Sequence, residues 1–241
     1  NRVNTGRETF ILPVDWSGTF PVFKGGLEPI QPKLVMPQGV KNETGKNGYF
    51  PNGNFTFTET FTGSSLDYRW VGVRGAREGF ISTTAEGLTI TPYETNIKAA
   101  LPTSTLFYRQ QHLNFTATTT LKYVPRTEKD LAGITCYQSE KFNYVFGVTK
   151  KAEDSYIVLQ RTEKGESSTI ASEKIEGNTP ISLRVKAEGD KYTFSYSVKD
   201  DNYQIVGGTV SGDILSTNVA GGFTGAMIGL YATTYNDAEA L

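Results

Sequence analysis

Four stretches of this chain alternate between two kinds of side chain, and this pattern limits the fold more than any other feature. In 181–188, Ile, Leu, Val and Ala alternate with Ser, Arg, Lys and Glu, while 192–198 alternates Tyr, Phe and Val with Thr and Ser. A period of two residues is typical of a β-strand with one buried and one exposed face. The alternation therefore predicts strands at 55–61, 115–123, 181–188 and 192–198.

Turn-forming residues separate the alternating stretches at short intervals, as at Gly165, Gly189 and Gly207–Gly208. Strands this close in sequence pair as antiparallel hairpins and meanders more readily than as strand–helix–strand units. No stretch shows the apolar pattern of an amphipathic helix of three turns. The sequence therefore predicts an all-β fold, a two-sheet antiparallel β-sandwich of the jelly-roll or lectin-like class.

The charge balance and the hydrophobic content exclude several classes of protein. The chain has 24 Lys and Arg against 25 Asp and Glu, so it lacks the basic face that neutralises nucleic-acid phosphates. We therefore expect no nucleic acid as a partner. No run approaches the ~18 apolar residues of a membrane-spanning helix, so we expect no membrane partner either. Hydrophobic residues make up 37% of the 241 residues, which suffices for a packed core.

The sequence offers no motif of a catalytic or metal centre. His112 is the only histidine, and no serine lies in a Gly-x-Ser-x-Gly turn. The single cysteine, Cys136, lies in an apolar run and is expected to be a buried small hydrophobe. Acidic residues fall in expected turns or on polar strand faces, so no carboxylate pair for glycoside hydrolysis can be assigned. We expect no cofactor; whether a calcium ion braces the sandwich stays open.

A few polar and aromatic side chains are candidates for binding. His112 lies at the start of an expected strand, where it is either a structural histidine or a polar residue of a binding face. Trp70, Tyr68, Tyr93 and Tyr137 are either platforms for sugar CH groups or residues of the core. Both interpretations stay open for each of these residues.

The first 37 residues differ from the rest, because they hold five of the ten prolines. Proline fixes φ and lacks the N–H that a strand ladder needs, so an extended, irregular segment is expected. Yet this segment also carries Phe10, Trp16, Phe20 and Phe23, which a free linker would not. We therefore expect it to lie against a neighbouring surface.

Two groups of motifs in the chain resemble segments of a known enzyme family. The stretch GRETFILPV lies at 6–14 and is followed by Trp16. It resembles the segment that closes the catalytic domain of the β-xylosidases of glycoside hydrolase family 43. The motifs that resemble their C-terminal domain follow in order along the chain: FYRQQHLNFTA at 107–117, AGIT at 132–135, NYVFGV at 143–148, YTFSYS at 192–197, AGGFTGA at 220–226 and GLYA at 229–232.

The resemblance implies a parent protein with a five-bladed catalytic propeller followed by a concanavalin A-like β-sandwich. Residues 1–37 would be the exit segment of the propeller plus a linker, and residues 38–241 would be the sandwich. The family's catalytic carboxylates precede the exit segment, so the parent would hydrolyse xylosides or arabinosides and this chain alone would not. The implied partners are the propeller of the same parent chain and a xylo- or arabino-oligosaccharide. A secreted or periplasmic location is expected rather than a cytoplasmic one, and a homo-oligomer stays open.

In these xylosidases a loop of the sandwich closes part of the active-site pocket and can present a phenylalanine. Phe223, in Gly-Gly-Phe-Thr-Gly, matches that loop, and a core phenylalanine in a turn is the alternative. Phe223, Arg109, His112 and Trp70 are the candidate residues of the pocket or of glycan binding. The expected function is an accessory domain that braces the propeller and completes its pocket. The alternatives are an independent carbohydrate-binding module for xylan-like glycans and a protein-interaction sandwich.

Overall fold

A computed structural model of the chain describes residues 3–7, 10–24, 29–31, 35, 38–39, 53–74, 79–176, 180–199 and 201–237. The chain forms two compact units, of which one is residues 7–56 and the other joins Asn1–Gly6 to Phe57–Leu241. The smaller unit contains the short antiparallel pair β1 (Val14–Asp15) and β2 (Val22–Phe23). The expected domain boundary after residue 37 adjoins positions outside the described residues and stays a prediction.

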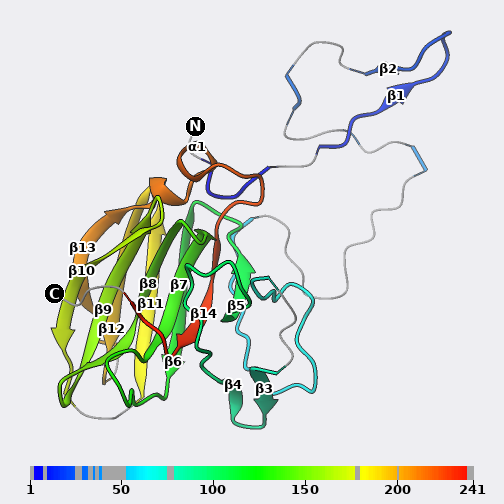
Figure 1. Ribbon diagram of the computed structural model, residues 1–241. Coiled ribbons are helices and arrows are strands. Elements are labelled where there is room, and N and C mark those ends of the chain that lie inside the picture. The colour runs from blue at the N-terminus through cyan, green and yellow to red at the C-terminus, as the bar shows by residue number, and fades with distance from the viewer. Residues whose placement is uncertain are drawn as a thin grey trace. The chain divides into compact units, whose positions relative to one another are not determined.

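The larger unit is built from two antiparallel sheets, as the alternation predicted (Figure 1). The six-stranded sheet has the order β10 (Glu166–Lys174), β9 (Asp154–Glu163), β8 (Phe142–Lys151), β7 (Leu131–Ser139), β14 (Met227–Thr233) and β5 (Ser104–Arg109). The four-stranded sheet has the order β13 (Gln204–Ser211), β12 (Lys191–Ser197), β11 (Ile181–Glu188) and β6 (Asn114–Leu121). A separate hairpin joins β3 (Ile81–Thr84) to β4 (Gly87–Ile90).

Helical structure in the described chain is confined to two short turns at one end of the sandwich. The 3-10 turn η1 (Gly212–Leu215) follows β13, and α1 (Thr217–Ala220) follows η1 directly. The loop of residues 221–226 then leads into β14. The chain thus turns back at this end from the four-stranded sheet to the six-stranded sheet, where β14 lies between β7 and the edge strand β5.

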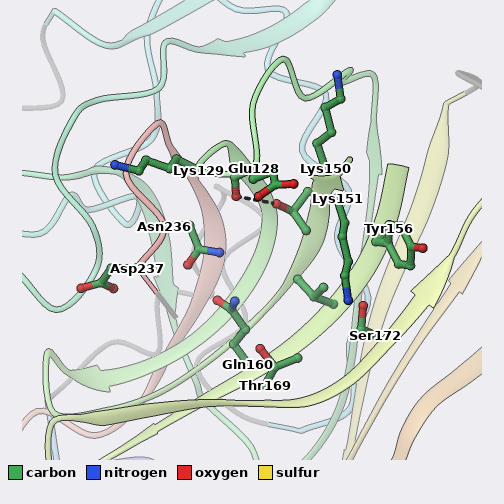
Figure 2. Close-up of a pocket in the computed structure, with 12 residues that line it drawn as sticks. Glu128, Lys129, Lys150, Lys151, Tyr156, Gln160, Thr169, Ser172, Asn236 and Asp237 are labelled. Carbon is green, nitrogen blue, oxygen red and sulfur yellow. Dashed lines mark hydrogen bonds between the residues drawn. The ribbon is translucent and has the colours of Figure 1, made fainter. Parts of the chain in front are cut away.

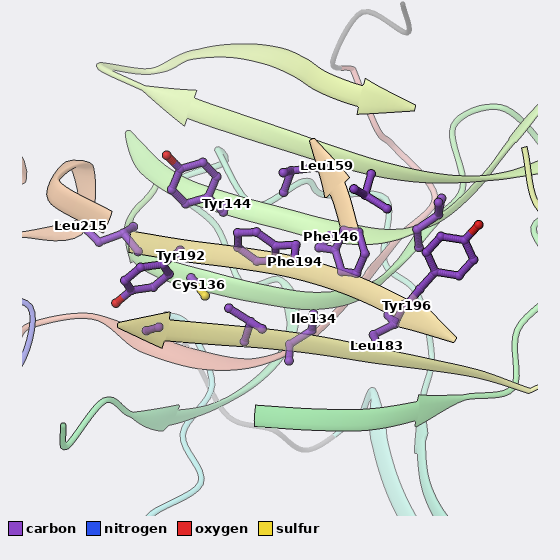
Figure 3. Packing of buried hydrophobic residues seen from close by; sticks show 14 of the residues in the cluster. Ile134, Cys136, Tyr144, Phe146, Leu159, Leu183, Tyr192, Phe194, Tyr196 and Leu215 are labelled. Atoms are coloured by element: carbon purple, nitrogen blue, oxygen red, sulfur yellow. The ribbon is translucent and has the colours of Figure 1, made fainter. Parts of the chain in front are cut away.

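Aromatic rings from both sheets meet in the main hydrophobic core (Figure 3). Tyr144 and Phe146 of β8 lie 5.7 Å and 5.5 Å from the ring of Phe194 on β12, measured between ring centroids. All three side chains are buried. Such ring pairs add about 0.5–1.5 kcal/mol beyond the area that they bury, so they hold the two sheets together. Cys136 is fully buried in the same core, as predicted.

A second core lies on the opposite face of the six-stranded sheet. Phe107 of β5 stacks on Tyr137 of β7 with 5.3 Å between ring centroids, and Tyr231 of β14 belongs to the same cluster. The segment before β5 covers this face, because Val71 pairs with Phe107 and the Ile97 N–H donates to Tyr231 Oη at 2.9 Å. Tyr137 is therefore a core residue and not a sugar platform.

The sequence-based predictions are confirmed for three of the four alternating strands. β6, β11 and β12 match the expected stretches, and β11 keeps the buried-to-exposed alternation along its length. The fourth prediction, a strand at 55–61, is wrong: the segment forms no ladder, and Phe61 has a φ of 57°. Its rings pack on Trp70 and Tyr108 instead, so tertiary contacts and not strand pairing account for its apolar residues.

The aromatic core leads to the first testable prediction. Phe194→Ala removes the ring that both Tyr144 and Phe146 contact, so it should lower the free energy of unfolding by about 3–5 kcal/mol. Urea denaturation followed by tryptophan fluorescence measures this change. Ile205→Ala, at an exposed position of β13, is the matched control and should change it by no more than about 0.5 kcal/mol. Similar losses in both variants would contradict the assigned core.

Candidate functional site

The loop between α1 and β14 presents Phe223 at the end of the sandwich. The ring is 63% exposed, so Phe223 is not a residue of either core. Gly221, Gly222 and Gly225 have φ values of 74°, 77° and 70°, a conformation that side-chain-bearing residues rarely adopt. The glycines thus let the backbone turn tightly on both sides of an aromatic residue that faces outward.

Hydrogen bonds from the six-stranded sheet hold this loop on both sides of Phe223. The Arg109 guanidinium donates from Nη1 to the Thr224 carbonyl at 2.9 Å. Gln138 of β7 donates from Nε2 to the Gly221 carbonyl at 2.7 Å. The structure therefore brings two of the predicted site residues together, with Arg109 supporting the backbone beside Phe223.

His112 lies three residues after Arg109, between the ends of β5 and β6. Its side chain is half-buried, and its carbonyl accepts a hydrogen bond from Gln110 Nε2 at 2.9 Å. Gln110 itself is buried and accepts from Tyr192 Oη at 2.8 Å. The position of His112 next to this buried network leaves both its predicted roles in place, as a structural residue or as part of a polar binding face.

Trp70 belongs to a different group of rings. Its centroid lies 5.4 Å from that of Tyr108 and 5.1 Å from that of Phe61, while Phe57 contacts Tyr108 from another direction. Arg69 lies over the Tyr108 ring. Trp70 is thus half-buried by packing, whereas Phe57 and the neighbouring Tyr68 are exposed, Tyr68 at 80%.

A polar pocket of about 280 Å³ opens on the face of the six-stranded sheet that points away from the main core (Figure 2). Val158, a member of the second core, lies in its wall, and Gln160 and Thr169 are buried beside it. The other groups around the pocket are hydroxyls, amides and charged side chains of Glu128, Lys129, Thr149, Lys150, Lys151, Tyr156, Ser172, Asn236 and Asp237. Sequence reasoning missed this pocket; the one available signal was Gln160 directly after the apolar run 157–159.

Charged groups of the described chain form local pairs. Lys174 bonds Asp154 at 2.7 Å, Lys186 bonds Glu188 at 2.8 Å, and Asp67 accepts from Arg69 Nε and Nη2 at 2.7 and 2.9 Å. Among the described residues, no three His, Cys, Asp or Glu side chains gather as metal ligands would. The helices described are also too short to cross a membrane.

The chain is similar along most of its length to part of larger enzymes. Residues 58–240 match the family model of the beta xylosidase C-terminal concanavalin A-like domain. The non-reducing end alpha-L-arabinofuranosidase BoGH43B of Bacteroides ovatus is 27% identical over 97% of this chain and 43% of its own length. The xylosidase/arabinosidase of Butyrivibrio fibrisolvens is also 27% identical, over 97% of this chain and 44% of the enzyme. The chain thus spans less than half the length of these relatives.

Two solved structures also align with nearly the whole of this chain and with less than half of their own length. The crystal structure of a GH43_12 protein from a capybara gut metagenome superposes with a TM-score of 0.87 at 47% identity, covering 96% of this chain and 44% of that one. The xylan beta-1,4-xylosidase of Bacillus halodurans C-125 superposes with a TM-score of 0.81 at 18% identity, covering 97% and 45%. The second likeness establishes the fold alone.

The Asp67–Arg69 pair beside Trp70 leads to a prediction on pH. Hydrogen bonds from Arg69 lower the pKa of Asp67 from 3.8 to about 2. Since the folded pKa lies below the unfolded one, the pair stabilises the fold above pH 4, and that contribution is lost as the pH falls towards 2. A ¹³C NMR titration of the Asp67 carboxyl should give a pKa of about 2 in the unsubstituted chain and a value nearer 3.8 in Arg69→Gln. Equal values in both proteins would contradict the pairing.

Proposed function

The chain belongs to the family of beta xylosidase C-terminal concanavalin A-like domains, and from this premise we propose that it is a non-catalytic accessory domain of a glycoside hydrolase. The parent enzyme would be a family 43 β-xylosidase or α-L-arabinofuranosidase. In it, this domain would brace the catalytic propeller and help to close its substrate pocket. The partners would be that propeller and a xylo- or arabino-oligosaccharide.

The coverage of the relatives supports a role beside a second domain. The relatives of Bacteroides ovatus and Butyrivibrio fibrisolvens align with 97% of this chain, while more than half of their own length lies outside the alignment. The names of both describe arabinofuranosidase or xylosidase activity. Asp154, Glu188 and Asp67 are each paired with a Lys or Arg side chain, which suits a structural role.

Exposed apolar side chains in residues 10–23 support contact with a further domain. Ile11, Trp16 and Phe20 are 83%, 74% and 76% exposed, and Phe10, Val22 and Phe23 are more than half exposed as well. Covering a side chain of this size contributes about 1.5–3 kcal/mol, so six such residues favour burial against a partner. The propeller, whose exit segment this stretch resembles, is the partner that we propose.

The single observation that carries the pocket-closing role is the exposed, anchored ring of Phe223. Its loop backbone is held by Arg109 and Gln138, whereas the residue itself is 63% exposed. A ring held in this way supplies an apolar wall against which a sugar face can pack and from which water is excluded. Arg109 then acts by positioning the loop. His112, two residues after the Gln110 whose N–H bonds to Ala226, would border the same surface.

The test is hydrolysis of 4-nitrophenyl β-xyloside and 4-nitrophenyl α-arabinofuranoside by the full-length parent. We expect Phe223→Ala to lower kcat/KM by about 10- to 100-fold, the loss of about 1.4–2.8 kcal/mol of binding to the transition state. Because the ring contacts bound substrate throughout the reaction, most of the loss should be a rise in KM. Val124→Ala, an exposed apolar position elsewhere, is the control. Unchanged kinetics in Phe223→Ala would contradict the pocket-closing role.

The polar pocket on the six-stranded sheet favours a second candidate, glycan binding by the sandwich itself. Gln160, Thr169 and Ser172 supply amide and hydroxyl groups of the kind that bind sugar hydroxyls, and Tyr156 lines the same pocket near Ser172 (Figure 2). Calorimetric titration of the chain with xylohexaose should then give a Kd of about 1 mM or tighter. Gln160→Met, of similar size, should abolish that binding, and Phe223→Ala should leave it unchanged. Absence of any binding would remove this candidate.

A further inference from the structure

We propose that Asn4 is a positioning residue: together with a crossing of the backbones at Gly6 and Gly225, it fixes the loop that presents Phe223. This inference rests on the proposed pocket-closing role. It implies that the segment 3–6 affects the affinity of the parent enzyme for its substrate. This segment leads directly into the unit of residues 7–56. The segment would thus tie the sandwich loop to the part of the chain that resembles the propeller's exit.

The side chain of Asn4 is built into the sandwich. It is 3% exposed, and its Nδ2 donates to the Gly212 carbonyl at 2.9 Å and to Tyr192 Oη at 3.2 Å. Tyr192 Oη in turn donates to Gln110 Oε1 at 2.8 Å. Burial raises the pKa of Tyr192, so its hydroxyl stays protonated and remains a donor. Asn4 is therefore bonded, directly or through one partner, to η1, to β12 and to the residue after β5.

The backbone of the same segment bonds to both ends of the α1–loop region. The Thr217 N–H donates to the Val3 carbonyl at 3.1 Å, and the Ala226 N–H donates to the Asn4 carbonyl at 2.7 Å. The Ala226 carbonyl then accepts from the Gln110 N–H at 3.0 Å. The stretch 217–226 is thus fastened at its first and last residues, with Phe223 between them.

Gly6 and Gly225 bring the two backbones into direct contact. A Cβ on Gly6 would lie 2.7 Å from the Thr224 carbonyl carbon and 2.8 Å from the Gly225 nitrogen. A Cβ on Gly225 would lie 2.5 Å from the Thr5 carbonyl carbon. These are backbone atoms, which cannot move aside as a flexible side chain would, and both glycines have φ between 70° and 80°. Any side chain at either position must therefore push the loop away from the segment.

This arrangement makes the position of the Phe223 ring depend on residues 4–6. Phe223 lies two residues before Gly225 and one before Thr224, whose carbonyl Arg109 holds. Arg109 and Gln138 support the loop from the sheet side, and the segment 3–6 supports it from the other. Loss of the Asn4 side-chain bonds would release the segment 3–6 from Gly212 and Tyr192, so the loop would lose a fixed support on that side.

The experiment measures steady-state kinetics of the full-length parent on 4-nitrophenyl β-xyloside and 4-nitrophenyl α-arabinofuranoside. We expect Asn4→Ala and Gly225→Ala each to lower kcat/KM by about 10-fold, mainly through a rise in KM. A displacement of a positioning group by about 1 Å can lower the rate by ~100-fold, so a displaced Phe223 ring accounts for a loss of this size. In a Phe223→Ala background, neither substitution should lower kcat/KM further, because the ring that they position is absent. The melting temperature of each variant identifies any that fail to fold.

Tyr231→Phe is the matched control, because it removes the hydroxyl of another buried tyrosine, one that accepts from the Ile97 N–H in the second core. It should lower the melting temperature and leave KM unchanged. If Asn4→Ala and Gly225→Ala lower stability but leave KM at the parent value while Phe223→Ala raises it, the positioning role is overturned and the pocket-closing role stands. If Phe223→Ala itself has no effect, both fall.

Discussion

Contact between the aromatic inner faces of the two sheets is the interaction on which the rest of the structure depends. Its centre is formed by the rings of Tyr144, Phe146 and Phe194. The strands that carry these rings set the distances between the loops at the ends of the sandwich. Interiors are packed as densely as organic crystals, so strands joined by such a core behave as a rigid frame. Loops that are hydrogen-bonded to that frame have a fixed position. The exposed ring of Phe223 can therefore be held in a defined place.

Tyr192 shows how the core is connected to the candidate site. Its ring packs within the sandwich, with Phe115 at 5.8 Å between centroids, while its hydroxyl contacts Asn4 and Gln110 at the rim. From Gln110 the connection continues to Ala226 and thus to the end of the Phe223 loop. One residue of the four-stranded sheet therefore links apolar packing, the N-terminal segment and the loop. The same geometry explains why glycine, and no other residue, fits at 6 and 225.

Physical reasons decide which features could be predicted from the sequence. β6, β11 and β12 have one covered and one exposed face, so their alternation was visible; β7, β8 and β9 are covered on both faces and show no such pattern. At 55–61 the residues alternate as they would in a strand, but the alternation arises from rings that pack on Trp70 and Tyr108. The motif around Phe223 revealed the loop, but the pocket at Gln160 and the contacts of Asn4 join residues far apart in sequence, 208 apart for Asn4 and Gly212.

The central claim, that this domain assists a catalytic neighbour and has no catalytic centre of its own, is tested most directly by its own activity. The measurement is release of 4-nitrophenol from 4-nitrophenyl β-xyloside by residues 1–241 alone, with the full-length parent under the same conditions as reference. We expect turnover by the parent and none above the protein-free blank by residues 1–241. Turnover by the isolated chain would contradict the claim and would place a catalytic carboxylate pair within the sandwich.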